Sequence, residues 1–163
     1  MFITSADGDD LVLLCLDSRN GAERWRRTVT SGNQDARAGE GNSASPSPST
    51  DGQHVWVFFS TGVLACYDFH GEEQWKFDVG ERFGKIDIQF GMASTPLLVD
   101  NYLYLQLIHG VLDRGDDTRS GQVIKLDKLS GETVWVQERI TQAGFECKQS
   151  YASPVLYDDG HQR

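Results

Sequence analysis

The sequence predicts an all-β fold, a β-propeller of about three four-stranded blades that form a partial ring or a fragment of one. Three observations support this: an internal repeat of about 50 residues, four strand-like segments per repeat, and strands that are apolar on both faces. The 163 residues suffice for a single domain, and no helical period persists over three turns. A β-sandwich is an alternative, but it would not require two motifs to recur in step.

Two motifs define the repeat. In the first, an Asp is followed by a Gly, and a Trp comes four residues after the Gly. It occurs as Asp17, Gly21 and Trp25, as Asp68, Gly71 and Trp75, and as Asp127, Gly131 and Trp135. The second motif is Ser/Thr-Pro, which lies 21, 21 and 19 residues after the preceding Trp, at Pro46, Pro96 and Pro154. The tryptophans are 50 and then 60 residues apart, and we place the extra ten residues in 110–120.

The strands follow from this repeat. The chain is expected to open on a second strand, Phe2–Ser5, and residues 1–28 carry the strands of a first blade. Residues 44–78 form the second blade, 94–139 the third, and 152–157 the first strand of a further blade, Ser153–Tyr157. The second blade is expected to contain the strands Ser45–Ser49, His54–Ser60, Val63–Asp68 and Glu73–Asp78, separated by Gly-containing turns.

Two predicted strands do not alternate between apolar and polar residues. They are Val55–Phe59 and Tyr102–Ile108. Antiparallel strands that are apolar on both faces need cover on both sides, which disfavours a single sheet with one face in water. Blades that are packed between like neighbours satisfy this requirement.

Each repeated residue has a structural role in this interpretation. The glycines supply the positive φ of the turn, and Asp17, Asp68 and Asp127 cap backbone N–H groups across it. The tryptophans lie on the outermost strands, where a large ring with one N–H donor can wedge between neighbouring blades. Each Pro begins an innermost strand, where the loss of one ladder donor is tolerated.

The Leu-Asp-x-x-x-Gly-x-x-x-Trp pattern resembles the repeat of the pyrroloquinoline-quinone-like (PQQ-like) propellers. That family includes quinoprotein alcohol dehydrogenases and the lipoprotein of the outer-membrane barrel-assembly machinery. The resemblance extends from Leu11 to Tyr157 and is specific for the repeat, not for an activity. It implies a bacterial protein in a periplasmic or other extracytoplasmic compartment, although the chain shows no signal peptide.

Charge and composition exclude several partners. Fifteen Lys and Arg against 24 Asp and Glu give a net charge of −9, which disfavours nucleic acid and anionic lipid. The basic run Arg24–Arg27 is interpreted as protection of an edge strand. No apolar run is long enough to span a membrane. The three cysteines, Cys15, Cys66 and Cys147, have no disulfide or zinc spacing and are expected to be buried free thiols.

The candidate binding face is the end that carries the long loops, because loops on a rigid scaffold commonly carry function. These loops are Val29–Ser43, Val79–Met92, Gly110–Ser120 and Ile140–Ser150. The candidate residues are Arg82, Phe83, Lys85, Gln89, Phe90 and Phe145, with Arg37, Glu40 and Lys148 beside them. The structural alternative is that they plug the ends of the blades. The expected partner is a protein or a small ligand.

Catalytic and metal signals are weak. The acidic segments Asp7–Asp10 and Asp113–Thr118 lack the order of a calcium loop, and no nucleophile elbow or phosphate loop is present. We therefore expect a non-catalytic scaffold without a cofactor. The alternative is a fragment of a quinoprotein alcohol dehydrogenase, which would need PQQ, calcium and an Asp base, and typically adjacent cysteines that this chain lacks. Self-association is a further expectation, with the strand Ser153–Tyr157 of one copy completing the three-strand set of another.

Overall fold

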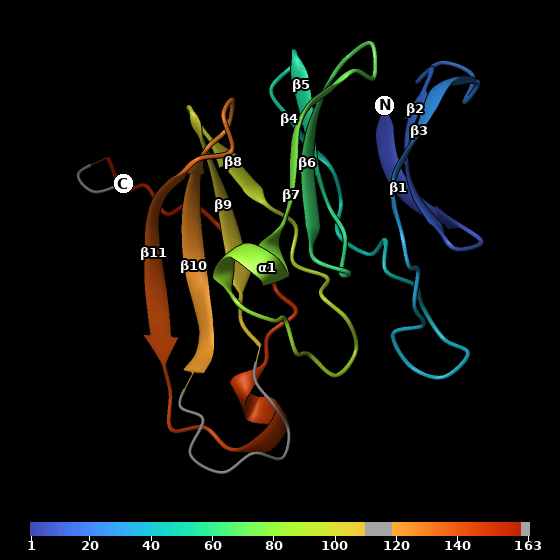
Figure 1. The fold of residues 1–163 in the computed structure, drawn as a ribbon. Helices are drawn as coiled ribbons and strands as arrows, with labels where there is room; N and C mark the ends of the chain where they lie inside the picture. The colour runs from blue at the N-terminus through green and yellow to red at the C-terminus, as the bar shows by residue number, and fades with distance from the viewer. Residues whose placement is uncertain (110–118, 161–163) are drawn as a thin grey trace.

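Three antiparallel sheets stand side by side in the computed structural model, which describes residues 1–109 and 119–160 (Figure 1). The first sheet contains β1 (Phe2–Asp7), β2 (Asp10–Leu16) and β3 (Glu23–Ser31). The second contains β4 (Ser49–Thr50), β5 (His54–Phe58), β6 (Val63–Asp68) and β7 (Glu73–Asp78). The third contains β8 (Leu97–Val99), β9 (Tyr102–Leu107), β10 (Arg119–Asp127) and β11 (Thr133–Ile140).

In each sheet the strands lie in chain order and pair with their neighbours. This arrangement confirms the predicted all-β fold with partial propeller blades of three, four and four strands. Two short helices accompany the sheets in the described residues, α1 (Val79–Phe83) and the 3-10 helix η1 (Phe145–Lys148). Neither is long and apolar enough to cross a membrane.

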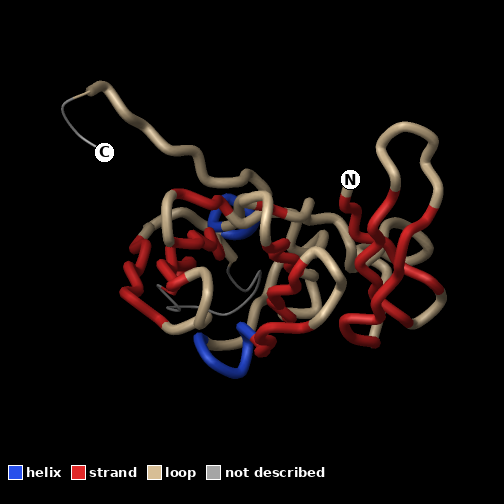
Figure 2. The backbone as a smooth tube through the Cα atoms, turned by 90° about the horizontal axis from the view of Figure 1, so that it is seen from above, coloured by secondary structure: helices blue, strands red, loops and turns tan. Residues whose placement is uncertain are grey.

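The innermost strands differ most from the expected ones. The predicted strand Ser45–Ser49 is reduced to β4, because Pro46 and Pro48 have no N–H group to donate and ladder pairing begins only at Ser49. The predicted strand Ser153–Tyr157 is not a strand: these residues are extended and mostly exposed, and in Figure 2 the C-terminal segment runs away from the sheets. A strand needs a hydrogen-bonded neighbour, and no described strand pairs with this segment.

Two apolar cores lie between the blades. The core between the first and second blades includes Leu11, Leu13, Val55, Val57 and Phe59. The core between the second and third blades contains Trp56, Phe58, Leu64 and Cys66 from the second blade, packed on Leu103, Leu105, Leu107, Ile124 and Leu126 from the third. The second blade is therefore covered on both faces, which explains why β5 does not alternate.

The third blade is covered on one face only by the described residues. In β9, Leu103, Leu105 and Leu107 are buried against the second blade, while Tyr102 and Tyr104 are half-buried on the opposite face. The expectation that Tyr102–Ile108 is covered on both sides is thus wrong for the described structure.

The first two motif tryptophans bridge neighbouring blades. The indole N–H of Trp25 donates to the carbonyl of Phe69, at 3.0 Å, and that of Trp75 donates to the carbonyl of Lys128, at 3.1 Å. Each acceptor is the residue directly after a motif aspartate. The same contact therefore joins the first blade to the second and the second to the third.

The motif aspartates shape the turns that receive these tryptophans. Asp68 Oδ1 accepts from the backbone N–H groups of Glu72 and His70, at 2.9 and 2.8 Å, and Asp127 Oδ1 accepts from Leu129 and Ser130, both at 2.9 Å. These hydrogen bonds hold the pKa of both carboxyls below the usual value. Each aspartate therefore fixes the backbone of the turn whose carbonyl accepts from a tryptophan.

In the turn between β10 and β11, the glycine leaves room for the indole of Trp75. Gly131 has a φ of 69°, and a Cβ there would lie 3.0 Å from the ring of Trp75. Gly21 has a similar φ of 74°, but a Cβ there would meet nothing within 4 Å. The two glycines share a conformation and differ in whether a tryptophan lies against them.

An ion pair adds to the contact between the second and third blades. Lys128 Nζ lies 3.0 Å from Asp51 Oδ2, and both side chains are largely buried. Burial raises the pKa of Asp51, but hydrogen bonds from the backbone of His54 and Gln53 and the charge of Lys128 outweigh it and lower that pKa to about 2. Asp51 is therefore charged in the folded state at neutral pH.

We predict that Gly131→Ala destabilises the fold more than Gly21→Ala. Both substitutions place a side chain at positive φ, which costs about 1–2 kcal/mol. Gly131→Ala also displaces the ring of Trp75, for which we expect a further ~1–3 kcal/mol. Urea unfolding of dilute protein measures both values. Equal losses for the two variants would show that the indole contact contributes nothing.

We also predict a pH-dependent effect of Asp51→Asn. The folded pKa of Asp51 is below its unfolded value, so its contribution is complete above that unfolded value and is lost as the pH falls through about 2. The wild type should be more stable than Asp51→Asn at neutral pH, and the difference should shrink in acid. Urea unfolding across pH tests this, with Asp9→Asn, in the exposed β1–β2 turn, as the charge control. A constant difference would contradict the prediction.

Candidate functional site

Long connections gather at one end of the sheets. The segments after β3 and β7, residues 32–48 and 84–96, lie at the lower end of Figure 1 with the β5–β6 turn and η1. The motif turns lie at the opposite end. The insertion 110–118, including the acidic segment Asp113–Thr118, lies outside the described residues.

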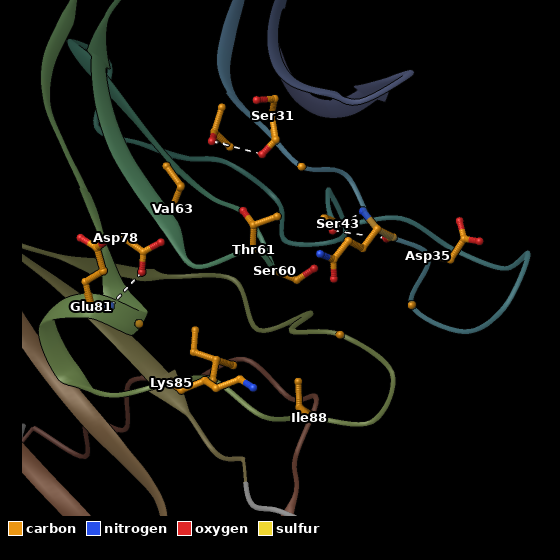
Figure 3. Close-up of a pocket in the computed structure, with 17 residues that line it drawn as sticks. Ser31, Asp35, Ser43, Ser60, Thr61, Val63, Asp78, Glu81, Lys85 and Ile88 are labelled. Atoms are coloured by element: carbon orange, nitrogen blue, oxygen red, sulfur yellow. Dashed lines mark hydrogen bonds between the residues drawn. The ribbon is translucent and has the colours of Figure 1, made fainter.

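A groove of about 670 Å³ opens at this end between the first and second blades (Figure 3). We call it the loop-end groove. Its lining residues come from the end of β3, the following loop, the β5–β6 turn and the segment from β7 to residue 91. They are Thr30, Ser31, Gly32, Gln34, Asp35, Ala36, Ser43, Ser60, Thr61, Val63, Asp78, Gly80, Glu81, Lys85, Ile86, Ile88 and Gly91.

Hydrogen bonds fix the wall formed by the first loop. Asn33 donates from its side chain to Gly8 O, at 3.1 Å, and its Oδ1 accepts from Ser43 N, at 3.0 Å. Ser43 is buried and its Oγ accepts from Gln34 N, at 3.2 Å, while Ser60 N donates to Ser43 O, at 2.8 Å. The loop is therefore attached to both the first and the second blade.

The opposite wall is fixed by the cap of α1. Asp78 Oδ1 accepts from Glu81 N, at 2.9 Å, and Val79 N donates to Gly62 O, at 2.8 Å. A side-chain acceptor at the N-cap satisfies a backbone donor that the helix cannot satisfy itself. The short helix therefore begins directly at the end of β7 and presents Glu81 and Lys85 to the groove.

The groove is polar and negatively charged. Asp35, Asp78 and Glu81 contribute three carboxylates, against one ammonium from Lys85. Figure 3 shows Asp78 and Glu81 at one side, Asp35 at the other, and Lys85 with Ile88 opposite Ser60 and Thr61. Within the part of the chain that the structure describes, Thr61 Oγ1 is buried without a hydrogen-bond partner. A ligand with cationic groups and hydrogen-bonding groups matches this surface best.

The candidate binding residues predicted from the sequence lie in different environments in the structure. Lys85 lines the loop-end groove. Arg82 does not: its guanidinium donates to Gly131 O, at 2.8 Å, and lies over the ring of Phe77, 4.6 Å from the centroid. Phe83 packs against the core between the second and third blades.

The remaining candidate residues lie in two places, the segment before β8 and the loop after β3. Gln89 N donates to the side chain of Gln149, at 3.2 Å, and the ring of Phe90 lies 6.1 Å from that of Tyr151. The side chain of Phe145 is outside what the structure describes. Arg37 and Glu40 pair through their backbones in the loop after β3. The candidate residues are thus not gathered at one site.

The basic run on β3 is engaged with the protein itself. Arg24 pairs with Asp17, Arg26 with Asp7 and Glu23, and Arg27 donates to Gly71 O, at 2.7 Å. The hydrogen bonds from Arg19 and Arg24 lower the pKa of Asp17 well below its usual range. These contacts engage the three arginines of the run with three carboxylates and a carbonyl of the protein itself, so the run is not a free basic surface.

Potential metal and redox groups are dispersed among the described residues, where no three His, Cys, Asp or Glu side chains cluster as metal ligands do. Cys15 and Cys66 are buried in different sheets as expected, but the expectation of a buried thiol is wrong for Cys147, which is exposed in η1 at the loop end. Burial raises the pKa of the Cys66 thiol to about 12, with smaller contributions from Asp51 and Asp68. The described residues therefore do not provide the clustered calcium ligands and adjacent cysteines that a bound PQQ would need.

The hydroxyl residues of the groove, Ser43, Ser60 and Thr61, were not expected from the sequence. They lie in turns and loops of ordinary composition, and only the tertiary arrangement brings them together. Asp78 is the one lining residue that the sequence could have indicated. An Asp three residues before a Glu, here Glu81, is typical of a helix start.

Comparisons with known proteins agree with the fold. Residues 8–160 match the family described as outer membrane protein assembly factor BamB. Among solved structures, the chain is similar to BamB from Moraxella catarrhalis, with a TM-score of 0.54, 22% identity, and coverage of 92% of this chain and 41% of that one. No curated protein sequence gave a significant match.

Two enzymes are similar in fold as well. One is a europium-containing methanol dehydrogenase, with a TM-score of 0.56, 19% identity, and coverage of 85% of this chain and 23% of that one. The other is the quinohemoprotein alcohol dehydrogenase ADHIIG from Pseudomonas putida HK5, with a TM-score of 0.57, 19% identity, and coverage of 83% of this chain and 20% of that one. The chain spans less than half the length of each of these structures.

We predict that Arg82 and Lys85 differ in what they contribute. Arg82→Ala should lower the free energy of unfolding by about 1–2 kcal/mol, because a charged hydrogen bond and a cation–π contact are lost. Lys85→Ala should change it by less than about 0.5 kcal/mol, as expected for an exposed residue. Thermal and urea unfolding measure both. A Lys85 variant that is as unstable as the Arg82 variant would assign Lys85 to the fold.

Proposed function

The chain belongs to the PQQ-like repeat family described as outer membrane protein assembly factor BamB, and on that basis we propose that it is a non-catalytic β-propeller scaffold that binds a protein segment through the loop-end groove. The observation that carries the proposal is the groove itself, which is polar, acidic and built on two rigid blades. Its volume is within the range of about 300–1,000 Å³ that is usual for ligand sites.

The lining chemistry favours a peptide over an apolar small molecule. Ser31, Ser43, Ser60 and Thr61 offer hydroxyl groups on a groove that also carries apolar side chains, Ala36, Val63, Ile86 and Ile88. Ser60 and Thr61 lie in the β5–β6 turn, opposite Lys85 and Ile88 in Figure 3. A peptide backbone supplies donors and acceptors along its whole length.

The charges favour a basic segment. The groove carries three carboxylates and one ammonium, and the whole chain has a net charge of −9. Lysine or arginine side chains on the ligand would pair with Asp35 at one side of the groove and with Glu81 at the other. Such charges raise the rate of encounter and select against acidic partners.

The competing function is that of a quinoprotein alcohol dehydrogenase fragment. Of two structures of similar fold, one is by name a quinohemoprotein alcohol dehydrogenase and the other a europium-containing methanol dehydrogenase. The described residues supply neither a clustered ligand set nor adjacent cysteines. The binding function is therefore preferred.

The test uses a capped hexapeptide of alternating lysine and threonine, with the glutamate–threonine peptide as its matched control. The lysine peptide should shift the backbone NMR signals of Thr61 and Gly80, and the glutamate peptide should not. Asp35→Asn combined with Glu81→Gln should weaken binding at least about fivefold, since each lost charge pair is worth about 0.5–1 kcal/mol. Glu132→Gln, on the opposite end of the third blade, should have no effect.

Two outcomes would overturn the proposal. Equal binding of the two peptides, or signal shifts away from the groove, would remove the groove as the binding site. Tight, calcium-dependent binding of PQQ with dye-linked alcohol oxidation would replace the scaffold function with the enzymatic one.

A further inference from the structure

The loop-end groove contains one ammonium beside its three carboxylates, that of Lys85. Other lysines of the chain are engaged with the protein itself. Lys76 and Lys128 each form an ion pair with a carboxylate, and Lys125 Nζ lies over a tyrosine ring. Lys85 makes no ion pair, hydrogen bond or ring contact with a described residue. Its charge is therefore available to a ligand.

The end of α1 explains why Lys85 does not pair with Glu81. Residues four apart on a helix are neighbours, so these two side chains would pair if the helix continued. The helix ends at Phe83, and Gly84 has a φ of 103° and a ψ of 150°, which turns the chain out of the helix. In Figure 3 the Lys85 side chain extends toward Ile88 and not toward Glu81. The positive charge is therefore separated from the nearest carboxylate in the sequence.

A serine hydroxyl lies across the groove from Lys85. It belongs to Ser60, in the β5–β6 turn (Figure 3). The backbone N–H of Ser60 donates to Ser43 O, at 2.8 Å, so the position of this serine is fixed. Its Oγ makes no hydrogen bond to a described residue, and unlike Thr61 Oγ1 it is not enclosed by the protein. Ser60 therefore offers an O–H donor on a rigid wall.

A carboxylate matches an ammonium and a hydroxyl that face each other. Its two oxygens accept hydrogen bonds but donate none, so one carboxylate can accept from Lys85 and from Ser60. Hydrogen bonds to an ionised group are stronger than those between neutral groups. Ile86 and Ile88 line the groove beside Lys85, and their apolar side chains reduce the screening of a charge pair by water.

We propose that the loop-end groove binds the C-terminal end of a basic peptide, with the terminal carboxylate between Lys85 and Ser60. The inference rests on the proposed function and adds to it the position of the end of the peptide. Three carboxylates and one ammonium in the groove match a ligand with several cationic groups and one anionic group. A basic segment carries such an anionic group at its C-terminus, which is ionised at neutral pH. This carboxylate is part of the backbone, so its binding orders no additional side chain.

The test compares the capped lysine–threonine hexapeptide, which ends in an amide, with the same peptide ending in a free carboxylate. NMR titrations at neutral pH measure both dissociation constants from the backbone signals of Ser60 and Thr61. The free acid should bind at least about threefold more tightly than the amide, as expected for one added charge pair. A third peptide is an amide with aspartate in place of the last threonine, and it should bind less tightly than the free acid.

Variants of the groove separate this contact from a general loss of structure. Lys85→Gln should bind the free acid and the amide equally, and should bind the amide at least as tightly as the wild type does, because a charge that repels lysine is gone. A misfolded variant would bind both peptides poorly. Ser60→Ala should reduce the preference for the free acid at least about twofold. Lys125→Gln, on β10 and outside the groove, is the matched control and should retain the full preference.

The outcomes distinguish this inference from the proposed function. Equal binding of the free acid and the amide to the wild type, or a preference that Lys85→Gln retains, would overturn the inference and leave the binding of basic peptides intact. An aspartate peptide that binds as tightly as the free acid would assign the contact to a side-chain carboxylate and would overturn it too. If neither lysine peptide binds, the proposed function and this inference both fail.

Discussion

The arrangement of the three blades depends on one recurring contact, an indole N–H bonded to a carbonyl in the turn of the next blade. A partly buried indole N–H is best satisfied by an acceptor, and the turn supplies one whose backbone its aspartate holds in place. Between the second and third blades, Gly131 leaves space for the ring of Trp75, whereas between the first and second blades Gly71 leaves space for the guanidinium of Arg27. The Asp, Gly and Trp of the motif therefore act in pairs of blades, which explains why they recur at a fixed spacing while the loops between them vary.

Much of the fold was predictable because its determinants are local and repeated. The motif turns and the apolar run Val55–Phe59 predicted β5, β6 and β7 within two residues of their observed ends. The innermost strands were less predictable, since Pro46 and Pro48 restrict pairing at β4. For Ser153–Tyr157 the pattern is strand-like, but a strand exists only when a neighbour binds its backbone. Sequence patterns report the tendency of a segment and not the presence of its partner.

The candidate site was predictable only in outline. The positions of the long loops indicated which end would carry a groove, and Lys85 lies in it. Arg82, only three residues away, belongs to the contact between blades. The short helix α1, capped by Asp78, decides that Arg82 meets a neighbouring carbonyl while Lys85 faces solvent. Residue spacing alone does not distinguish the structural role of Arg82 from the groove position of Lys85. Both positions result from packing between segments that are about 50 residues apart in the sequence.

The burial of Cys66 makes this thiol a natural reporter of blade separation. It lies in the core between the second and third blades, and its raised pKa leaves little thiolate at neutral pH. Cys147 is exposed and offers an internal reference for reagent access. The ratio of alkylation rates at the two thiols therefore records how often these blades part while each sheet remains intact. Such an opening event would go unnoticed in measurements that follow only the overall loss of β-structure.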